Sequence, residues 1–244
     1  MPVLDDLLAS LPTDNVQVRQ VLVGAHWTVV CSRRAGMAAS LMSERPHGHT
    51  HVRDVGRLHL KPARELAELA RSTDLLEASI GVAAINSLLD VQESAAREIN
   101  ASAVLAARGK GRNVALVGHF PFIEQLRPAV GQLWVLELHP AEGEHPAEAA
   151  ADLLPRADVV AITGSALANH TLDELLALCS PGATVMVLGP STPLSPVLFA
   201  HGATIISGTR VVDEAAVLRT VGQGASFRQV EGTKLLTLVR DEAT

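Results

Sequence analysis

The sequence predicts an α/β protein with two units: a small α+β domain over residues 1–108, and a domain over 109–244 built on a mostly parallel sheet. Two patterns favour this class. From residue 113 onward, short apolar runs recur every ~20–25 residues with helical patterns or proline-rich loops between them, as in βαβ units. Before residue 108, strand-like runs come first and helical patterns follow, which indicates an α+β arrangement.

The first domain is predicted to begin with an amphipathic helix over 3–11 and strands over 16–23 and 27–32. A loop rich in glycine and histidine follows, and then helices over 63–71 and 75–89. The loop contains His47-Gly48-His49-Thr50-His51. On a strand these imidazoles would share one face and could bind zinc or nickel, whereas Pro46 and Gly48 favour a loop that binds metal adventitiously. The segment 109–112 is the expected linker.

The second domain is predicted to be Rossmann-like. Its strands are expected at 113–118, 132–138, 158–163, 184–188 and 204–206. These runs lack polar alternation, which fits strands covered on both faces. A last strand over 234–240 is expected at an edge of the sheet. Thr171 and Glu174 form a T-x-x-E pattern, which predicts a capping box and a helix starting after Asn169.

Composition and charge exclude several classes of partner. A net charge of −6 argues against nucleic acid and anionic membrane, and an aromatic content of 2% argues against binding by base stacking. No apolar run approaches the ~20 residues that span a bilayer. The N-terminal segment has no basic leader, and Cys31 and Cys179 form no CxxC pair, so we expect a cytoplasmic protein. A homodimer is the base-rate expectation for its assembly.

Polar turns follow four of the predicted strands. Because ligands of doubly wound sheets bind beyond the carboxyl ends of the strands, we expect these turns to meet at one rim of the sheet. They are Gly118-His119-Phe120-Pro121, Glu137-Leu138-His139-Pro140, Thr163-Gly164-Ser165 through Asn169-His170, and Gly189-Pro190-Ser191-Thr192-Pro193.

The first turn does not fit a dinucleotide. A pyrophosphate needs close backbone approach over glycines, yet only Gly118 is present, and Phe120 and Pro121 would crowd the site. Glu137 does lie where a ribose-binding acid would be found, but this single feature does not predict NAD. His119 has three possible roles: a metal ligand, a proton donor, or a side chain buried between the domains.

The later turns carry hydroxyl groups. Ser191 and Thr192 are expected to enter a helix whose first turn contains a proline, where they would either hold an oxyanion or cap the helix. Ser165 can contact a ligand, but no neighbouring base is identifiable that would make it a nucleophile.

Five segments of the chain resemble a known family. GHFPFIEQLRP, LELHPAEGEHP, LLPRADVVAITGSALANHTLDELL and GPSTPLSPVLFAHGATIISG, in this order, are similar to the heavy-metal-chelation family of bacteria and archaea. LLEASIGVAAINSLL resembles the usual N-terminal partner domain of that family, which has an enolase-N-terminal-like fold. The His47–His51 loop matches no motif of the family.

The resemblance implies an enolase-N-terminal-like domain joined to a Rossmann-like domain, with the active site in the cleft between them. His119 and Glu137 would be the metal ligands, and His119 the catalytic residue. Phe120 would stack on a ring or exclude solvent. The full set of cleft residues implied by the resemblance is Gly81, Asn86, Gly118, His119, Phe120, Glu137, Thr163, Gly164, Ser165, Asn169, Gly189, Pro190, Ser191 and Thr192.

Two functions remain as hypotheses. The first is a protein that binds a divalent transition metal or a metal chelate, because histidine nitrogen and carboxylate oxygen are abundant here and thiolates are scarce. The turns hold few carboxylates, which favours a metal carried by an organic chelator over a bare ion. The alternative is a lyase, isomerase or transferase acting on a small anionic or ring-containing metabolite, with His119 as acid or base and Ser191 and Thr192 holding the anion.

Overall fold

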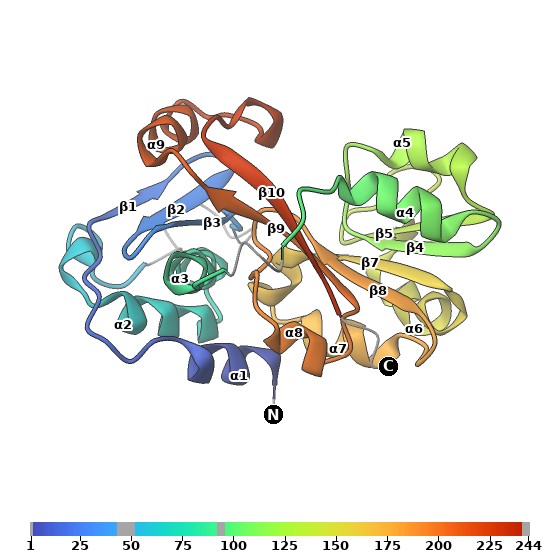
Figure 1. Cartoon of the computed structure of the whole chain (residues 1–244), viewed down its shortest axis with the longest axis horizontal. Coiled ribbons are helices and arrows are strands. Elements are labelled where there is room, and N and C mark those ends of the chain that lie inside the picture. Colours follow the sequence, from blue (N-terminus) through green and yellow to red (C-terminus); the bar gives the residue numbers. More distant parts are fainter. Residues whose placement is uncertain (1, 43–51, 92–95, 241–244) are drawn as a thin grey trace.

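The computed structural model describes residues 2–42, 52–91 and 96–240, and its strands form two sheets (Figure 1). A three-stranded antiparallel sheet has the order β1-β2-β3, and a seven-stranded sheet has the order β10-β9-β8-β7-β4-β5-β6. The predicted α/β class is confirmed. The predicted loop at 43–51, with His47, His49 and His51, lies outside the described residues.

The small sheet is formed by a meander, with α3 packed against β2 and β3. The strand β3 was not predicted, because its residues Ala35-Gly36-Met37-Ala38-Ala39 have low β-propensity. Their small size instead lets α3 lie close to the strand: a Cβ added at Gly36 would meet the Ala83 carbonyl oxygen at 2.3 Å. The elements of this unit are α1 (Val3–Ser10), β1 (Gln20–Val23), β2 (Trp27–Cys31), β3 (Ala35–Ala39), η1 (Leu58–Leu60), α2 (Ala63–Ala67), η2 (Glu68–Arg71) and α3 (Leu75–Leu88).

The large sheet is parallel except for β10, which pairs antiparallel with β9. The strand β10 lies at an edge of the sheet, as predicted. The strand β4 lies between β5 and β7, so the winding direction changes at β4 and β7. This change of direction is the switch point at which ligands bind in doubly wound sheets. The strands are β4 (Asn113–Val117), β5 (Gln132–Glu137), β6 (His145–Pro146), β7 (Val159–Thr163), β8 (Thr184–Leu188), β9 (Ile205–Val211) and β10 (Thr233–Val239).

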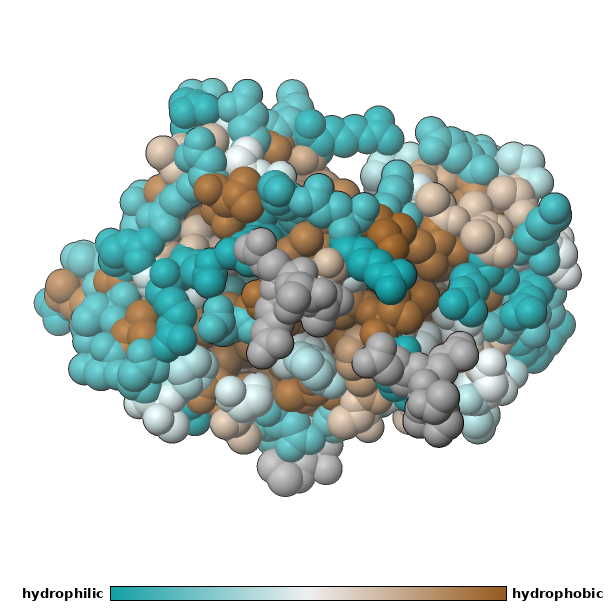
Figure 2. All heavy atoms as spheres, in the orientation of Figure 1, coloured by the Kyte–Doolittle hydropathy of each residue, from teal (hydrophilic) through white to brown (hydrophobic). Residues whose placement is uncertain are grey.

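Helices cover both faces of the large sheet. Leu105 of α4 and Ile123 of α5 join a core cluster on one face, whereas Leu172 of α7 and Leu198 of α8 belong to the cluster on the other. In the space-filling view, hydrophobic residues show mainly in the middle, between β10 and α4, and polar residues cover the outer edges (Figure 2). The helical segments are α4 (Ala101–Gly109), α5 (Ile123–Leu126), η4 (Arg127–Ala129), η5 (Ala147–Ala149), α6 (Ala150–Leu153), η6 (Leu154–Arg156), η7 (Gly164–Leu167), α7 (Leu172–Leu178), α8 (Val197–Ala200), α9 (Glu214–Gly222) and η8 (Phe227–Gln229).

The two units are joined by a common hydrophobic core. One core cluster runs from Val3 and Ile85 in the small unit to Ile162 and Val187 in the large sheet. On the opposite face of the small sheet, Val217 and Val221 of α9 pack with Val29, Cys31 and Met37. A helix from the end of the chain therefore covers a sheet from its beginning. Among the described residues, no helix is both long enough and apolar enough to cross a bilayer.

Three local predictions are wrong. Residues 109–112 are no linker, because α4 packs on β7 and the chain turns there directly into β4. Thr171 stands at the N-cap of α7 without a capping bond, since its hydroxyl donates to Asn169 Oδ1 at 2.7 Å. Ser191 and Thr192 do not enter a helix, because α8 begins only at Val197, after Pro196.

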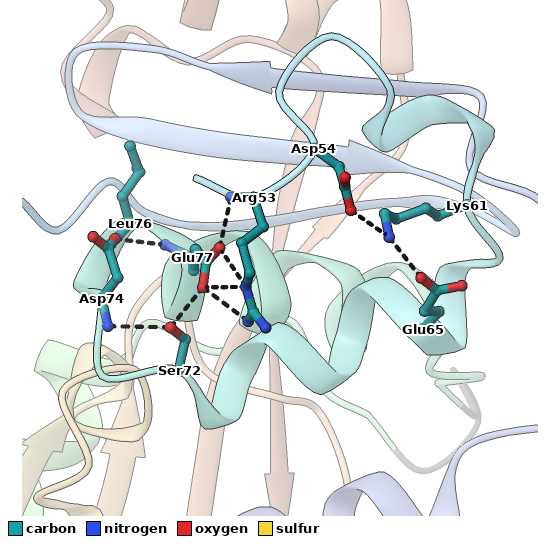
Figure 3. Close-up of polar contacts among 8 residues, drawn as sticks. All are labelled: Arg53, Asp54, Lys61, Glu65, Ser72, Asp74, Leu76 and Glu77. Atoms are coloured by element: carbon teal, nitrogen blue, oxygen red, sulfur yellow. Dashed lines mark hydrogen bonds and ion pairs between the residues drawn. The ribbon is translucent and has the colours of Figure 1, made fainter. Parts of the chain in front are cut away.

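A buried carboxylate fixes the first turn of α3 (Figure 3). Glu77 is 3% exposed, and its carboxylate accepts hydrogen bonds from the Arg53 backbone (2.7 Å), the Arg53 guanidinium (2.9 Å) and the Ser72 hydroxyl (2.6 Å). Burial by itself would raise the pKa of this carboxyl group. The hydrogen bonds from Arg53 and Ser72 outweigh burial and lower the pKa to about 2. Asp74 caps the helix by accepting from the backbone of Leu76 at 3.0 Å.

The Glu77 carboxylate predicts a specific loss of stability in acid. Its folded pKa lies below the ordinary value of 4.5, so its contribution is complete above pH 4.5 and is lost as the pH falls toward 2. Replacing Glu77 by Gln should remove about 3 kcal/mol of this pH dependence, as measured by urea unfolding across that range. Glu65→Gln, an exposed carboxylate, is the matched control. Equal pH dependence in Glu77→Gln and the native protein would contradict the assignment.

Gly81 predicts a second stability effect. An alanine in a helix interior is normally favoured over glycine by about 1 kcal/mol. At Gly81, however, an added Cβ would lie 1.9 Å from the backbone nitrogen of Ala70, and both backbones would have to move. Gly81→Ala should therefore lower the free energy of unfolding by about 2–3 kcal/mol in urea denaturation. Gly182→Ala, where nothing lies within 4 Å of the added atom, should be neutral, and equal effects would refute the packing argument.

Candidate functional site

A cleft of about 570 Å³ lies at the carboxyl ends of β4, β5 and β7, at the switch point of the large sheet. Its size falls within the ~300–1,000 Å³ range of small-molecule sites. Leu41, Met42 and Leu75 line it from the small unit. The structure brings six of the predicted site residues to this cleft: Gly118, His119, Glu137, Thr163, Ser165 and Asn169.

Gly118 permits the turn that places His119 at the rim. Its φ of +109° is a backbone conformation that residues with a side chain rarely adopt. A Cβ at this position would also lie 3.0 Å from the side chain of Thr163. The glycine therefore lets the ends of β4 and β7 approach each other and directs the following residue toward the cleft.

His119 is paired with a carboxylate that the sequence analysis missed. Its Nδ1 lies 3.0 Å from Oε1 of Glu144, and the other oxygen of Glu144 accepts the backbone N–H of Ala141 at 2.9 Å. The Glu144 side chain is 9% exposed, whereas that of His119 is 66% exposed. Glu144 falls within LELHPAEGEHP, so the motif marked its position, but the sequence could not show that the loop returns to His119.

The electrostatics of this pair define the tautomer of His119. The N–H of Ala141 lowers the pKa of the Glu144 carboxyl group, burial opposes this, and the hydrogen bond with His119 lowers it further. An ionised carboxylate can only accept a hydrogen bond, so Nδ1 must carry the proton. The neutral imidazole then has its lone pair on Nε2, where it can bind a metal or accept a proton.

The rest of the cleft offers hydroxyl, amide and carboxylate groups. The hydroxyl groups of Thr163 and Ser165 lie 2.9 Å apart. Asn169 uses its carbonyl oxygen to accept from Thr171, so its amide nitrogen is the group that can donate to a ligand. Glu137 lines the cleft, and its Oε2 accepts from the backbone of Leu138 at 3.1 Å.

The other predicted site residues lie elsewhere. Phe120 is 8% exposed in the core and stacks on Phe122, with ring centroids 5.3 Å apart. Gly81 is packed against Ala70. The remaining residues, which do not line the cleft, are Asn86, Gly164, Gly189, Pro190, Ser191 and Thr192.

Asn86 and Ser191 form hydrogen bonds that join the small unit to the large one. The Ser191 hydroxyl accepts the backbone N–H of Ala39 at 2.8 Å, and Asn86 Nδ2 donates to the carbonyl oxygens of Met37 (2.8 Å) and Ser191 (3.2 Å). Ser191 is only 3% exposed. These side chains are therefore used in the contact between β3, α3 and the turn after β8.

The donor side chains of the described residues limit how the protein can bind a metal. Over residues 2–42, 52–91 and 96–240, no group of three or more His, Cys, Asp or Glu side chains could hold an ion. The cleft nevertheless contains His119 with its oriented Nε2, together with carboxylates at Glu137, Glu148 and Glu174. Within the described residues, the cleft therefore offers these donor side chains singly and not as a cluster of three or more.

The fold defines the class: an α/β protein with a mostly parallel seven-stranded sheet and a cleft of about 570 Å³ at its switch point. The chain belongs to the DUF364 family, described as "Putative heavy-metal chelation", whose profile matches residues 100–240. A second profile with the same description, DUF4213, matches residues 4–89. The family resemblance predicted from the sequence motifs is confirmed.

Relatives agree with this assignment. The chain is similar to an uncharacterised protein of Methanocaldococcus jannaschii, with 29% identity over 186 residues, or 73% of this chain and 70% of the relative. A DUF364 protein of unknown function from Desulfitobacterium hafniense DCB-2 has a crystal structure with a TM-score of 0.85 and 30% identity, covering 98% of both chains. A DUF364 structure from Pyrococcus horikoshii has the same fold, with a TM-score of 0.79 at 19% identity and coverage of 97% of this chain and 98% of that one.

The His119–Glu144 pair can be tested without a ligand. At a pH where the imidazole is neutral, the ¹⁵N shifts of the ring nitrogens should identify His119 as the Nδ1–H tautomer, because Glu144 holds that proton. In Glu144→Ala, the spectrum should move toward the Nε2–H form, while His26, which lies in the turn between β1 and β2 and does not line the cleft, should not change. A predominantly Nε2–H form in the native protein would contradict the hydrogen bond.

Proposed function

We propose that this protein binds a small organic metal chelate in the cleft at the carboxyl ends of β4, β5 and β7. The observation that carries the proposal is the His119–Glu144 pair at the rim, with Nδ1 and Oε1 3.0 Å apart. A carboxylate that accepts from one ring nitrogen orients the other toward a metal and increases its basicity. His119 would supply one nitrogen ligand to a metal that arrives already chelated.

The count of ligands supports a chelate over a bare ion. Zinc and similar ions usually take four protein ligands in closed sites and three in open ones. His119 supplies one imidazole nitrogen, and Glu137 already accepts a backbone hydrogen bond. A chelator that fills most coordination positions would leave a single position for His119. The family description points to the same chemistry.

The walls of the cleft match an organic ligand with one apolar and one polar side. Leu41, Met42, Leu136 and Leu138 supply apolar surface, and Leu138 is 64% exposed. On the side of β7, Ser165 and Asn169 offer a hydroxyl and an amide donor. Apolar walls with a few placed polar groups are typical of sites for small molecules.

The same pair also favours a second candidate function. A histidine hydrogen-bonded to a buried carboxylate is an arrangement used for general base catalysis, with Nε2 taking the proton. In this reading the protein is a lyase, isomerase or transferase, and the cleft binds a small anionic or ring-containing metabolite. The turnover of a candidate metabolite, and its loss in Glu144→Gln, would distinguish this function from binding alone.

The test is elemental analysis together with native mass spectrometry of tag-free protein purified without chelator. We expect a metal in near-stoichiometric amount together with an added mass larger than the metal alone. His119→Ala should lower the metal content at least tenfold, because the metal-ligating nitrogen is lost. His145→Ala, outside the cleft lining, is the matched control and should retain the metal.

Three other outcomes would contradict part of this proposal. A metal bound with no organic mass would refute the chelate and indicate a site made by the protein itself. An organic mass without metal would favour the enzymatic candidate. Retention of the metal chelate in His119→Ala would remove His119 from the site, whatever the ligand.

A further inference from the structure

The ionisable side chains that line the cleft are nearly all of one sign. Three are carboxylates, at Glu137, Glu148 and Glu174, and the fourth is the imidazole of the paired histidine. No lysine or arginine lines the cleft in the part of the chain that the structure describes. Because carboxylates are ionised at neutral pH, this lining carries negative charge and no permanent positive charge.

The three carboxylates come from different elements of the large unit. Glu137 ends β5, Glu148 lies in η5, and Glu174 lies in the first turn of α7. Within residues 2–42, 52–91 and 96–240, they do not gather into a group that could hold a bare ion. Their negative charge is therefore spread over the lining and acts on the whole occupant of the cleft.

Arg127 acts on the rim of the cleft from outside the lining. Its positive charge favours the ionised carboxylate of Glu144, and its guanidinium lies 4.0 Å from Glu124. Neither of these carboxylates lines the cleft. The charge of Arg127 is thus divided between two groups other than the carboxylates of the lining.

Walls of one charge select the charge of the ligand. A cleft lined by a single sign of charge, with apolar surface around it, concentrates ligands of the opposite sign. Leu75, Leu175 and Leu178 supply such apolar surface here. An anionic ligand would lose hydration in this cleft without gaining a paired cation, which costs free energy. The lining therefore matches a ligand with positive charge.

The apolar part of the lining is aliphatic. Among the described residues, no aromatic side chain lines the cleft. Phe120, which follows His119 in the chain, is buried in the core against Phe122. Flat aromatic ligands are commonly held by stacking on such rings, whereas leucine and methionine side chains suit aliphatic carbon.

The net charge of a metal chelate depends on the donor atoms of the chelator. A divalent ion that is bound by neutral amines keeps both positive charges, whereas each carboxylate donor removes one. We infer that the cleft selects a positively charged chelate, in which an aliphatic chelator binds a divalent metal through amine nitrogens, over chelates made with carboxylates. This inference rests on the proposed function, because His119 supplies the remaining ligand.

The test compares two copper(II) chelates of similar size and different charge. Diethylenetriamine binds copper through three neutral nitrogens and gives a doubly positive complex. Iminodiacetate binds it through one nitrogen and two carboxylates and gives a neutral complex. Each leaves one equatorial position that an imidazole can fill. Calorimetric titration of the full chain with each complex, at neutral pH and equal ionic strength, gives the affinities, and the binding that remains in His119→Ala is subtracted.

The affinity of each complex for free imidazole corrects for its intrinsic preference. After this correction, the diethylenetriamine complex should bind the His119 position about tenfold more tightly than the iminodiacetate complex, because it is attracted by the lining carboxylates. High salt should reduce this preference to about threefold. The double variant Glu148→Gln/Glu174→Gln should lose most of it. The control Glu65→Gln/Glu68→Gln removes the same charge outside the cleft lining and should keep it.

The possible failures of the two proposals are distinguishable. Equal corrected affinities, or tighter binding of the iminodiacetate complex, would overturn the charge selectivity and leave chelate binding at His119 intact. If neither complex showed binding that depends on His119, the proposed function would fail and this inference with it. A preference that survives Glu148→Gln/Glu174→Gln, or that falls equally in the control, would also overturn the role of the lining. Urea unfolding of each variant separates loss of binding from loss of folding.

Discussion

The close packing of α3 is the constraint on which both the cleft and the contact between the two units depend. A side chain at Gly36 would collide with Ala83 of the helix, and a side chain at Gly81 would collide with Ala70, so backbone lies against backbone on two sides of α3. The carboxylate of Glu77 then holds its first turn. Since Leu75 lines the cleft and Asn86 donates to the turn after β8, this one helix positions both a wall of the cleft and the contact between the units.

The strand order of the large sheet brings together the polar residues of the cleft. The change of direction between β4 and β7 brings the turns after these strands together, and Gly118 allows them to approach closely. A loop leading to β6 then returns Glu144 to His119. The chemistry of the rim thus comes from two places in the chain 25 residues apart. Neither residue would be oriented alone: His119 is mostly exposed, and the nearly buried Glu144 restricts its ring.

Much of this could be predicted from the sequence, and the failures have physical causes. Apolar runs located β4, β5, β7 and β8 within a residue or two, because a strand buried on both faces must be apolar throughout. The strand β3 was not predicted, because its alanine and glycine residues have low β-propensity and are explained instead by the close approach of α3. The role of Ser191 was also not predicted. Its hydroxyl suggested a ligand contact, but it accepts the backbone N–H of Ala39, a long-range contact that no local pattern encodes.

The end of β7 is held in place by the turn that follows β8. Thr163 and Ser165 line the cleft, and the residue between them, Gly164, lies so close to Thr192 that an added Cβ would be 2.3 Å from the Thr192 hydroxyl. Interiors packed this tightly leave little room for displacement. The hydroxyl groups of Thr163 and Ser165 are therefore presented by a strand end whose position is set by packing before any ligand binds, and a side chain at position 164 would have to displace it.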